Sequence, residues 1–375
     1  MEIFFSHTTA LEIIRRWDSF LLMGAEGGGG SGAPSPDMPG SELVGSLVDG
    51  LPALSGATLP LHVLVGGSER RRRTEVVCAH LARPSYPEGS FFPVAPGVWC
   101  STPELVALQM AEYATDLELT MLVDELCGLY GIQPYARSGL VQRDRPLTTL
   151  ARIERYADEA GQTRGAAKLR RALGRAREQS GSPQESRGCH RLEFGPLEGG
   201  YGISVVALND PLTVERAGAL LAETATHVRK PDLLLLAPGG RDDAPTPFRA
   251  VAVDYQGRHH REEARASADV TRRNELLACD VKDYEIAKEH YDDRPYMDWL
   301  VSRIRHDLGI PEPRLSPKRA AELEALRDDL TRRLAAADGL HWTARRRPLV
   351  MAGASDFVGA TVGVRGAPDP RPPLA

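Results

Sequence analysis

The 375-residue chain is poor in several features that would assign it quickly to a class. Its five cysteines are scattered along the chain and form no C-x-x-C pair, which argues against a zinc ribbon or a redox dithiol. Isolated cysteines of this kind are typical of reduced, buried thiols, so we expect a cytoplasmic protein. The five are Cys78, Cys100, Cys127, Cys189 and Cys279.

The chain also lacks an apolar run of about 18 residues, the length that a membrane-spanning helix needs. The segment from Met1 to Trp17 has neither the basic start nor the long apolar core of a secretory signal. The net charge is −5, so no chain-wide basic field by itself indicates nucleic-acid binding. We therefore expect no membrane partner, and we expect any anionic partner to be held by local basic patches.

The order of predicted helices and strands indicates an α/β protein with four segments. A smaller α+β domain is expected at residues 1–135, with a flexible loop rich in glycine, proline and serine at 24–40. A basic helical linker follows at 136–181, and a mixed-sheet domain flanked by helices follows at 182–310. Residues 311–375 are expected to form one helix and a disordered tail.

Hydrophobic periodicity and capping residues predict the individual elements. In the first domain we expect helices at 6–14, from 101 onward and at 117–130, and strands at 61–65, 91–94 and 98–100. In the second domain we expect a helix capped by Ser182, helices at 261–277 and 297–308, and strands at 203–208, 231–236, 249–255 and 281–286. A charged helix is expected at 318–337.

Two apolar strands each carry an aspartate at one end. Asp232 opens the strand Pro231 to Leu236, and Asp254 closes the strand that runs into Tyr255. A buried, unpaired carboxylate costs several kcal/mol, so each needs a cation or a hydrogen-bond partner. Two carboxylates that meet at neighbouring strand ends suit Mg²⁺ or Mn²⁺, with the Tyr255 carbonyl as a third oxygen. The alternative is that each aspartate caps a turn or pairs with an arginine.

Histidine and arginine follow the second strand. His260 could transfer a proton beside a metal-bound water, or it could lie in an exposed loop. Arg272 and Arg273 could brace the carboxylates or hold a phosphate. Two further basic sets are either solvated surfaces or contacts to a nucleic-acid backbone. The first comprises Arg70, Arg71, Arg72 and Arg73, and the second lies in the segment 137–177, with Lys168, Arg170 and Arg171.

As an ordered set, several motifs resemble the very-short-patch-repair-like branch of the PD-(D/E)XK nuclease superfamily. They are Ser182-Pro183-Gln184-Glu185, Pro231-Asp232-Leu233, Val253-Asp254-Tyr255-Gln256-Gly257-Arg258-His259-His260 and Asp269-Val270-Thr271-Arg272-Arg273-Asn274. The resemblance implies a restriction-endonuclease-like sheet, with Glu185 as the helix acid, Asp232 as the first metal ligand and Asp254 as the second. It places Gln256 where the superfamily usually has lysine, or an acid in this branch.

Glutamine can orient a water molecule by hydrogen bonds, but it cannot neutralise developing charge. Gln256 and the short acid Asp254 therefore keep two interpretations open. The first is a Mg²⁺-dependent DNA endonuclease of a phage-defence or toxin–antitoxin-like system, with Glu185, Asp232, Asp254, Gln256 and His260 at its active site. The second is a catalytically inactive, nuclease-fold DNA-binding regulator. A third interpretation is a partner of a separate toxin or antitoxin protein.

The front of the chain resembles the amino-terminal region of abortive-infection antitoxin-type regulators. The motifs are Ser6-His7-Thr8-Thr9-Ala10-Leu11-Glu12, Leu61-His62-Val63-Leu64-Val65, Ser101-Thr102-Pro103-Glu104-Leu105 and Asp124-Glu125-Leu126-Cys127-Gly128-Leu129-Tyr130. This resemblance implies a DNA-binding or autoregulatory module fused to the nuclease-like domain.

Overall fold

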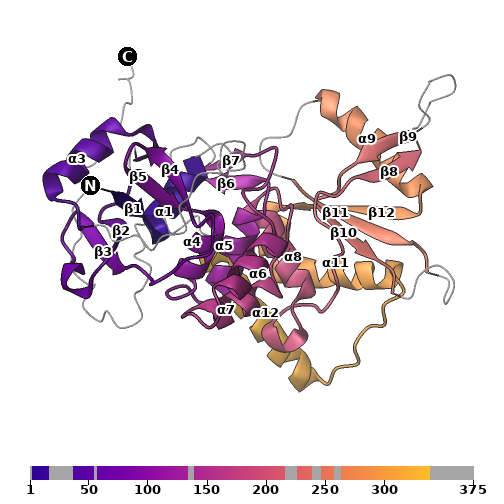
Figure 1. Ribbon diagram of the computed structural model, residues 1–375. Helices are drawn as coiled ribbons and strands as arrows, with labels where there is room; N and C mark the ends of the chain where they lie inside the picture. Colours follow the sequence, from indigo (N-terminus) through magenta and orange to yellow (C-terminus); the bar gives the residue numbers. More distant parts are fainter. Residues whose placement is uncertain are drawn as a thin grey trace, which may run out of the picture.

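The computed structural model describes residues 2–16, 37–54, 57–133, 139–215, 226–238, 246–256 and 263–337. The protein has a mixed α/β fold with two principal sheets (Figure 1). A five-stranded sheet forms in the amino-terminal half and a three-stranded sheet in the carboxy-terminal half. The two sheets lie at opposite ends of the molecule with helices between them (Figure 1).

The five-stranded sheet has the order β3-β2-β1-β5-β4. Its central strand β1 pairs antiparallel with β2 and parallel with β5. The predictions of β2, β4 and β5 are confirmed, whereas β1 and β3 were not expected from the sequence. The strands are β1 (Ile3–Phe5), β2 (Leu61–Val65), β3 (Val77–Leu81), β4 (Phe91–Ala95) and β5 (Val98–Ser101).

Helices cover this sheet and extend its core. Within α1, the side chains of Ala10, Leu11, Ile13 and Ile14 are buried against the sheet and α4. The helices of this half are α1 (His7–Arg16), α3 (Ser41–Gly50), α4 (Pro103–Met110), α5 (Asp116–Leu126), α6 (Leu150–Glu159) and α7 (Ala166–Leu173), with short 3-10 helices η1 (Pro52–Leu54) and η2 (Ser68–Arg70). The small hairpin of β6 (Tyr130–Ile132) and β7 (Leu140–Gln142) follows α5.

The helix predicted at 117–130 ends earlier, at Leu126. Gly128 lies so close to the Asp124 carbonyl oxygen that a Cβ there would be 2.7 Å from it. The chain turns at this glycine, and Tyr130 then enters β6. The expected extension to residue 130 is therefore wrong.

The predicted linker at 136–181 contributes directly to the first core. Leu169 and Ala172 of α7 are buried there, as are Ile153 and Ala157 of α6. The basic side chains of α7 accordingly occupy the opposite side of an amphipathic helix, as the sequence indicates.

The three-stranded sheet has the order β10-β11-β12, with β10 antiparallel and β12 parallel to β11. One face packs on α8 and α11, and the other packs on α9 and the β8–β9 hairpin. The elements are α8 (Pro183–Glu193), η3 (Pro196–Glu198), β8 (Leu212–Glu215), β9 (Thr226–Arg229), β10 (Leu233–Leu236), β11 (Ala250–Gln256), α9 (Glu263–Ala278), β12 (Val281–Ala287), α10 (Lys288–Asp292) and α11 (Arg294–Asp307).

The strand predicted at 203–208 is wrong. Ile203 and Val205 are buried as alternation predicts, but the segment makes only an isolated bridge, from Ala207 to Leu234. Ile203 instead donates its N–H to the Leu192 carbonyl at the end of α8, at 2.7 Å. The backbone hydrogen bonds of this segment are therefore divided between the end of α8 and Leu234 of β10, which accepts the Val206 N–H and donates to the Ala207 carbonyl.

A buried polar junction ties α8 to the amino-terminal half. His190 Nε2 lies 2.6 Å from Asp124 Oδ2 of α5, and both side chains are fully buried. The other oxygen of Asp124 accepts the N–H of Arg177 at 2.7 Å. The Arg177 side chain in turn pairs with Glu193 of α8 at 2.6 Å.

The last described helix, α12 (Pro317–Ala337), packs against both halves. Its Leu330 and Leu334 meet Met121 of α5 and Phe194 at the end of α8. None of the helices in the described ranges is long and apolar enough to cross a membrane. The predicted tail, and most of the predicted loop at 24–40, lie outside the described residues.

We expect Leu334→Ala to lower the free energy of unfolding by about 2–5 kcal/mol, because Leu334 is fully buried and the substitution leaves a cavity. Urea unfolding followed by circular dichroism measures the change. Leu315→Ala, at a position that is 40% exposed just before the helix, is the control and should shift stability by less than about 0.5 kcal/mol. Equal effects of the two substitutions would contradict the packing of α12.

Candidate active site

The structure brings Asp232 and Asp254 together at the same end of the three-stranded sheet. Leu233 pairs with Val253 in the antiparallel register of β10 and β11, so the two aspartates lie opposite one another. The backbone N–H of Asp232 donates to Asp254 Oδ1 at 2.9 Å, and the N–H of Tyr255 donates to Asp232 Oδ2 at 2.6 Å. These reciprocal bonds fix both carboxylates.

A third acid, Asp283 of β12, joins them, and the sequence reasoning missed it. It pairs with Ala252 in the parallel register, which places it on the same face of the sheet as Asp254. Its Oδ1 atom is buried and has no hydrogen-bond partner among the described residues. Burial, followed by the charge of Asp254, raises the pKa of Asp283 to about 7. The available signal was an acid within the predicted strand 281–286.

Glu185 lies near this cluster but also caps its own helix. Ser182 Oγ accepts the Glu185 N–H at 3.2 Å and donates to Glu185 Oε1 at 2.9 Å. Glu185 Oε2 accepts from the Gly181 N–H and the Asn209 side chain, each at 2.6 Å. Burial raises the pKa of Glu185, these hydrogen bonds oppose the rise, and the charge of Asp254 adds to it.

The electrostatics show how closely these acids interact. Burial raises the pKa of Asp232 to about 8, with the charges of Glu185 and Asp254 as the next causes. Like charges in a poorly solvated site favour protonation or a bound cation. The cluster of Glu185, Asp232, Asp254 and Asp283, called the carboxylate cluster below, therefore has the electrostatic character of a cation site.

Arg272 of α9 supplies one positive charge, through an ion pair with Asp254. This pairing raises the pKa of Arg272 against the opposing effect of its burial. The neighbouring Arg273 pairs with Glu285 of β12 at 3.0 Å. Both arginines therefore contact carboxylates. Arg272 braces Asp254, as one of the two predicted roles requires, and Arg273 binds Glu285 instead.

Two predicted catalytic residues are described incompletely. The backbone of Gln256 ends β11, in register with Ala287, but its side chain is outside the described part of the structure. His260 lies outside the described residues altogether. Their roles stay predictions.

The predicted nucleic-acid contacts fall on separate elements. In α7, Lys168 donates to the Ala114 carbonyl at 2.8 Å, Arg170 pairs with Asp158 at 3.1 Å and Arg171 pairs with Asp116 at 3.4 Å. Arg70 ends η2 and pairs with Asp37 at 3.0 Å, while Arg71, Arg72 and Arg73 follow it as exposed residues. The arrangement leaves their role in DNA binding a prediction.

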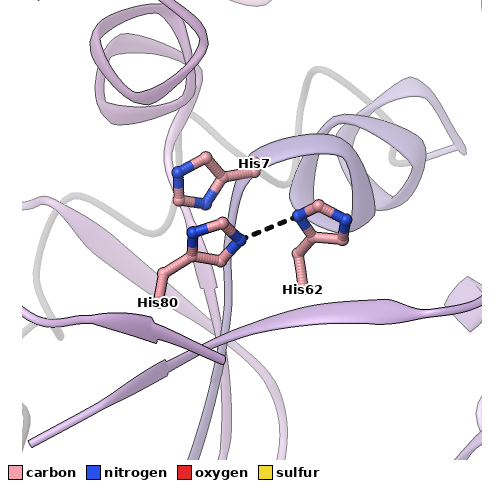
Figure 2. Close-up of side chains that lie close together, drawn as sticks. All are labelled: His7, His62 and His80. Carbon is pink, nitrogen blue, oxygen red and sulfur yellow. Dashed lines mark hydrogen bonds between the residues drawn. The ribbon is translucent and has the colours of Figure 1, made fainter. Parts of the chain in front are cut away.

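A group of three histidines in the amino-terminal half was not predicted at all. Ring nitrogens of His7, His62 and His80 all lie within 4.8 Å of one another (Figure 2). Burial lowers the pKa of His62 to about 4 and that of His80 to about 3, and it lowers that of His7 well below the ordinary value. The three come from three separate elements, so no spacing motif marks them in the sequence.

Neither the protein-family models nor the curated proteins nor the solved structures gave a match to the chain.

The raised pKa of Asp283 predicts a pH dependence of stability. The folded state retains the proton up to about pH 7, whereas an unfolded aspartate loses it near 3.8, so the free energy of unfolding should fall as pH rises between these values. Asp283→Asn, which removes the titrating group and keeps nearly the same side-chain shape, should reduce this fall. Urea unfolding in metal-free buffer at about pH 5 and pH 8 measures the slope.

The control for this experiment is Asp329→Asn, which removes a 44% exposed acid on α12. It should leave the pH dependence unchanged. If Asp283→Asn shows the same dependence of unfolding free energy on pH as the wild type, Asp283 does not titrate between these pH values.

Proposed function

We propose that this protein is a metal-dependent DNA endonuclease that hydrolyses phosphodiester bonds. The observation that carries the proposal is the convergence of Asp232, Asp254 and Asp283 on one face of a mixed sheet, with Glu185 of α8 beside them. The resemblance to very-short-patch-repair-like nucleases supports the same proposal, since it assigns three of these four acids to the metal site. We include in this proposal that the domain at 182–310 has a restriction-endonuclease-like fold.

The donor set fits Mg²⁺ or Mn²⁺. All four side chains offer carboxylate oxygens, which are the ligands these hard cations prefer. The buried Oδ1 of Asp283 has no hydrogen-bond partner among the described residues, and a cation would satisfy it. When bound, such an ion supplies an activated water and neutralises charge on the phosphodiester.

The protein's own residues orient this donor set. The Asp232 and Tyr255 N–H groups hold the two strand-end carboxylates in place. Arg272 fixes Asp254 from the side of α9 and limits the negative charge that the cluster carries. Ser182, Gly181 and Asn209 hold Glu185 in one orientation. Gln256 would orient the attacking water by hydrogen bonds, and His260 would assist proton transfer.

The alternative proposal is a catalytically inactive DNA-binding regulator that keeps the nuclease fold as a scaffold. Two observations favour it. Arg272 already neutralises Asp254, and the usual lysine position carries Gln256. A regulator needs neither the metal nor the lysine, but it does need phosphate contacts. A toxin or antitoxin protein partner is compatible with either proposal.

Supercoiled plasmid distinguishes the two proposals. We expect wild-type protein with Mg²⁺ or Mn²⁺ to nick it and Asp254→Asn to lower the rate by about 100-fold or more, since even outer partners of metal ligands cost roughly 10- to 100-fold. Gel electrophoresis of the relaxed form measures the rate. Asp329→Asn is the matched control on a distant exposed surface. No nicking above Asp254→Asn in either metal would overturn the enzyme proposal.

Salt dependence tests the DNA contacts that both proposals need. If Arg71 and Arg72 contact phosphates, the double variant Arg71→Gln/Arg72→Gln should flatten the plot of log affinity against log salt by about 0.9 per lost contact. Fluorescence anisotropy with a labelled duplex measures this slope. The matched control, Arg319→Gln/Arg332→Gln, removes two exposed arginines from α12. Identical slopes for both variants would exclude these two arginines as phosphate contacts.

A further inference from the structure

The histidine group of the amino-terminal half has no role in the proposed nuclease. His7 begins α1 directly after β1, His62 lies on β2 and His80 lies on β3 (Figures 1 and 2). The parallel register of β2 and β3 pairs Leu64 with His80, which sets His62 and His80 on the same face of the sheet. The sheet and the helix start therefore place three imidazoles at one point.

We propose that His7, His62 and His80 bind one divalent transition-metal ion, with zinc as the best match. His80 Nε2 lies 2.9 Å from His62 Nδ1, and all three side chains offer a ring nitrogen within 4.8 Å of the others. Tetrahedral zinc with Zn–N bonds of about 2.0–2.1 Å places its nitrogens about 3.4 Å apart. The 2.9 Å distance is shorter than that value and the 4.8 Å limit is longer. His7 and His80 stack with ring centroids 3.7 Å apart, so metal binding requires these rings to turn until their nitrogens point at one ion.

Neighbouring groups orient the rings as outer partners of metal ligands do. Tyr113 Oη lies 3.5 Å from His80 Nδ1, which leaves His80 Nε2 directed toward His62. Ser6 Oγ lies 2.9 Å from His7 Nδ1, and Gln109 accepts the backbone N–H of His7 at 2.9 Å. These contacts restrict the His80 and His7 rings, and none of them uses His80 Nε2.

The backbone at His7 is also held in an uncommon conformation, which it shares with Gln179, Asn209 and Asp280 among the described residues. Its φ of 50° lies in the left-handed region, which residues with a Cβ rarely adopt. The Gln109 hydrogen bond holds this conformation. Such backbone strain concentrates at ligand and active sites, where the surroundings enforce it.

The charge around the histidine group indicates what completes the coordination. Three neutral imidazoles leave the full charge of the ion uncompensated, and Arg71 and Arg73 are close enough to act electrostatically on His80. The arginines disfavour a bare cation, so the remaining position should hold an anion such as hydroxide. One side chain that could supply this anion is Cys78, whose Sγ lies 3.7 Å from His80 Nε2. As a thiolate it would close the site like a structural zinc site, which has four protein ligands, whereas hydroxide would leave the position exchangeable.

Zinc binding to the untagged 375-residue chain tests the proposal. After exposure to Zn²⁺ and dialysis, we expect one zinc per chain by elemental analysis, and tetrahedral absorption bands when Co²⁺ replaces it. His80→Asn and His62→Asn should each lower the zinc affinity by at least about 100-fold, measured by competition with a chromophoric chelator. His62 is the less buried of the two, so its substitution is the milder one for folding.

Two controls keep the result specific. His306→Gln removes a histidine that is 62% exposed on α11, and it should leave the zinc content unchanged. Asp254→Asn disables the proposed nuclease cluster and should also leave it unchanged, so failure of one proposal does not imply failure of the other. Circular dichroism verifies that each variant is folded. Substoichiometric zinc in the wild type, or folded His62→Asn with wild-type affinity, would overturn the proposal and leave the imidazoles as core packing.

Discussion

The carboxy-terminal half depends on the burial of several like charges at one point. Asp232 and Asp254 are each fixed by a backbone N–H from the other's strand end, and this reciprocal bonding holds their oxygens in place whether or not they are ionised. Asp283 then meets Asp254 from the neighbouring parallel strand. Burying several acids together lowers the stability of the fold. Proteins retain such destabilising groups mainly where binding or catalysis requires them.

The strand-end aspartates could be predicted from the sequence because one opens an apolar strand and the other closes one, and antiparallel pairing brings these two ends together. Asp283 could not be singled out in the same way, because its position depends on the parallel pairing of β11 with β12 across a helix. The segment 203–208, which was predicted as a strand, shows the same dependence on tertiary contacts. The apolar residues there predicted a strand, but no pattern reveals that the backbone hydrogen bonds of this segment are divided between the end of α8 and β10.

The amino-terminal half shows a related limit. Four of the five residues of β2 are apolar, which predicts a strand, whereas the three residues of β1 are too few to show any period, although β1 is the centre of the sheet. Because β1 brings His7 into position, the histidine group could not be predicted without it. The sequence predicts that the α7 arginines carry a positive surface, but it does not predict their partners. The acids that pair with Arg170 and Arg171 come from α6 and α5, at separations of 12 and 55 residues.

The junction at Asp124 has a consequence for how such a chain can evolve. Asp124 and His190 are fully buried and come from different halves, and Arg177 and Glu193 extend the same contact. Replacing either half with a foreign domain would leave an isolated polar group in an interior without water. The two halves are therefore not interchangeable modules joined by a tether. They constrain each other's substitutions, and a recombination breakpoint would have to fall where it keeps α5 and α8 in the same parent.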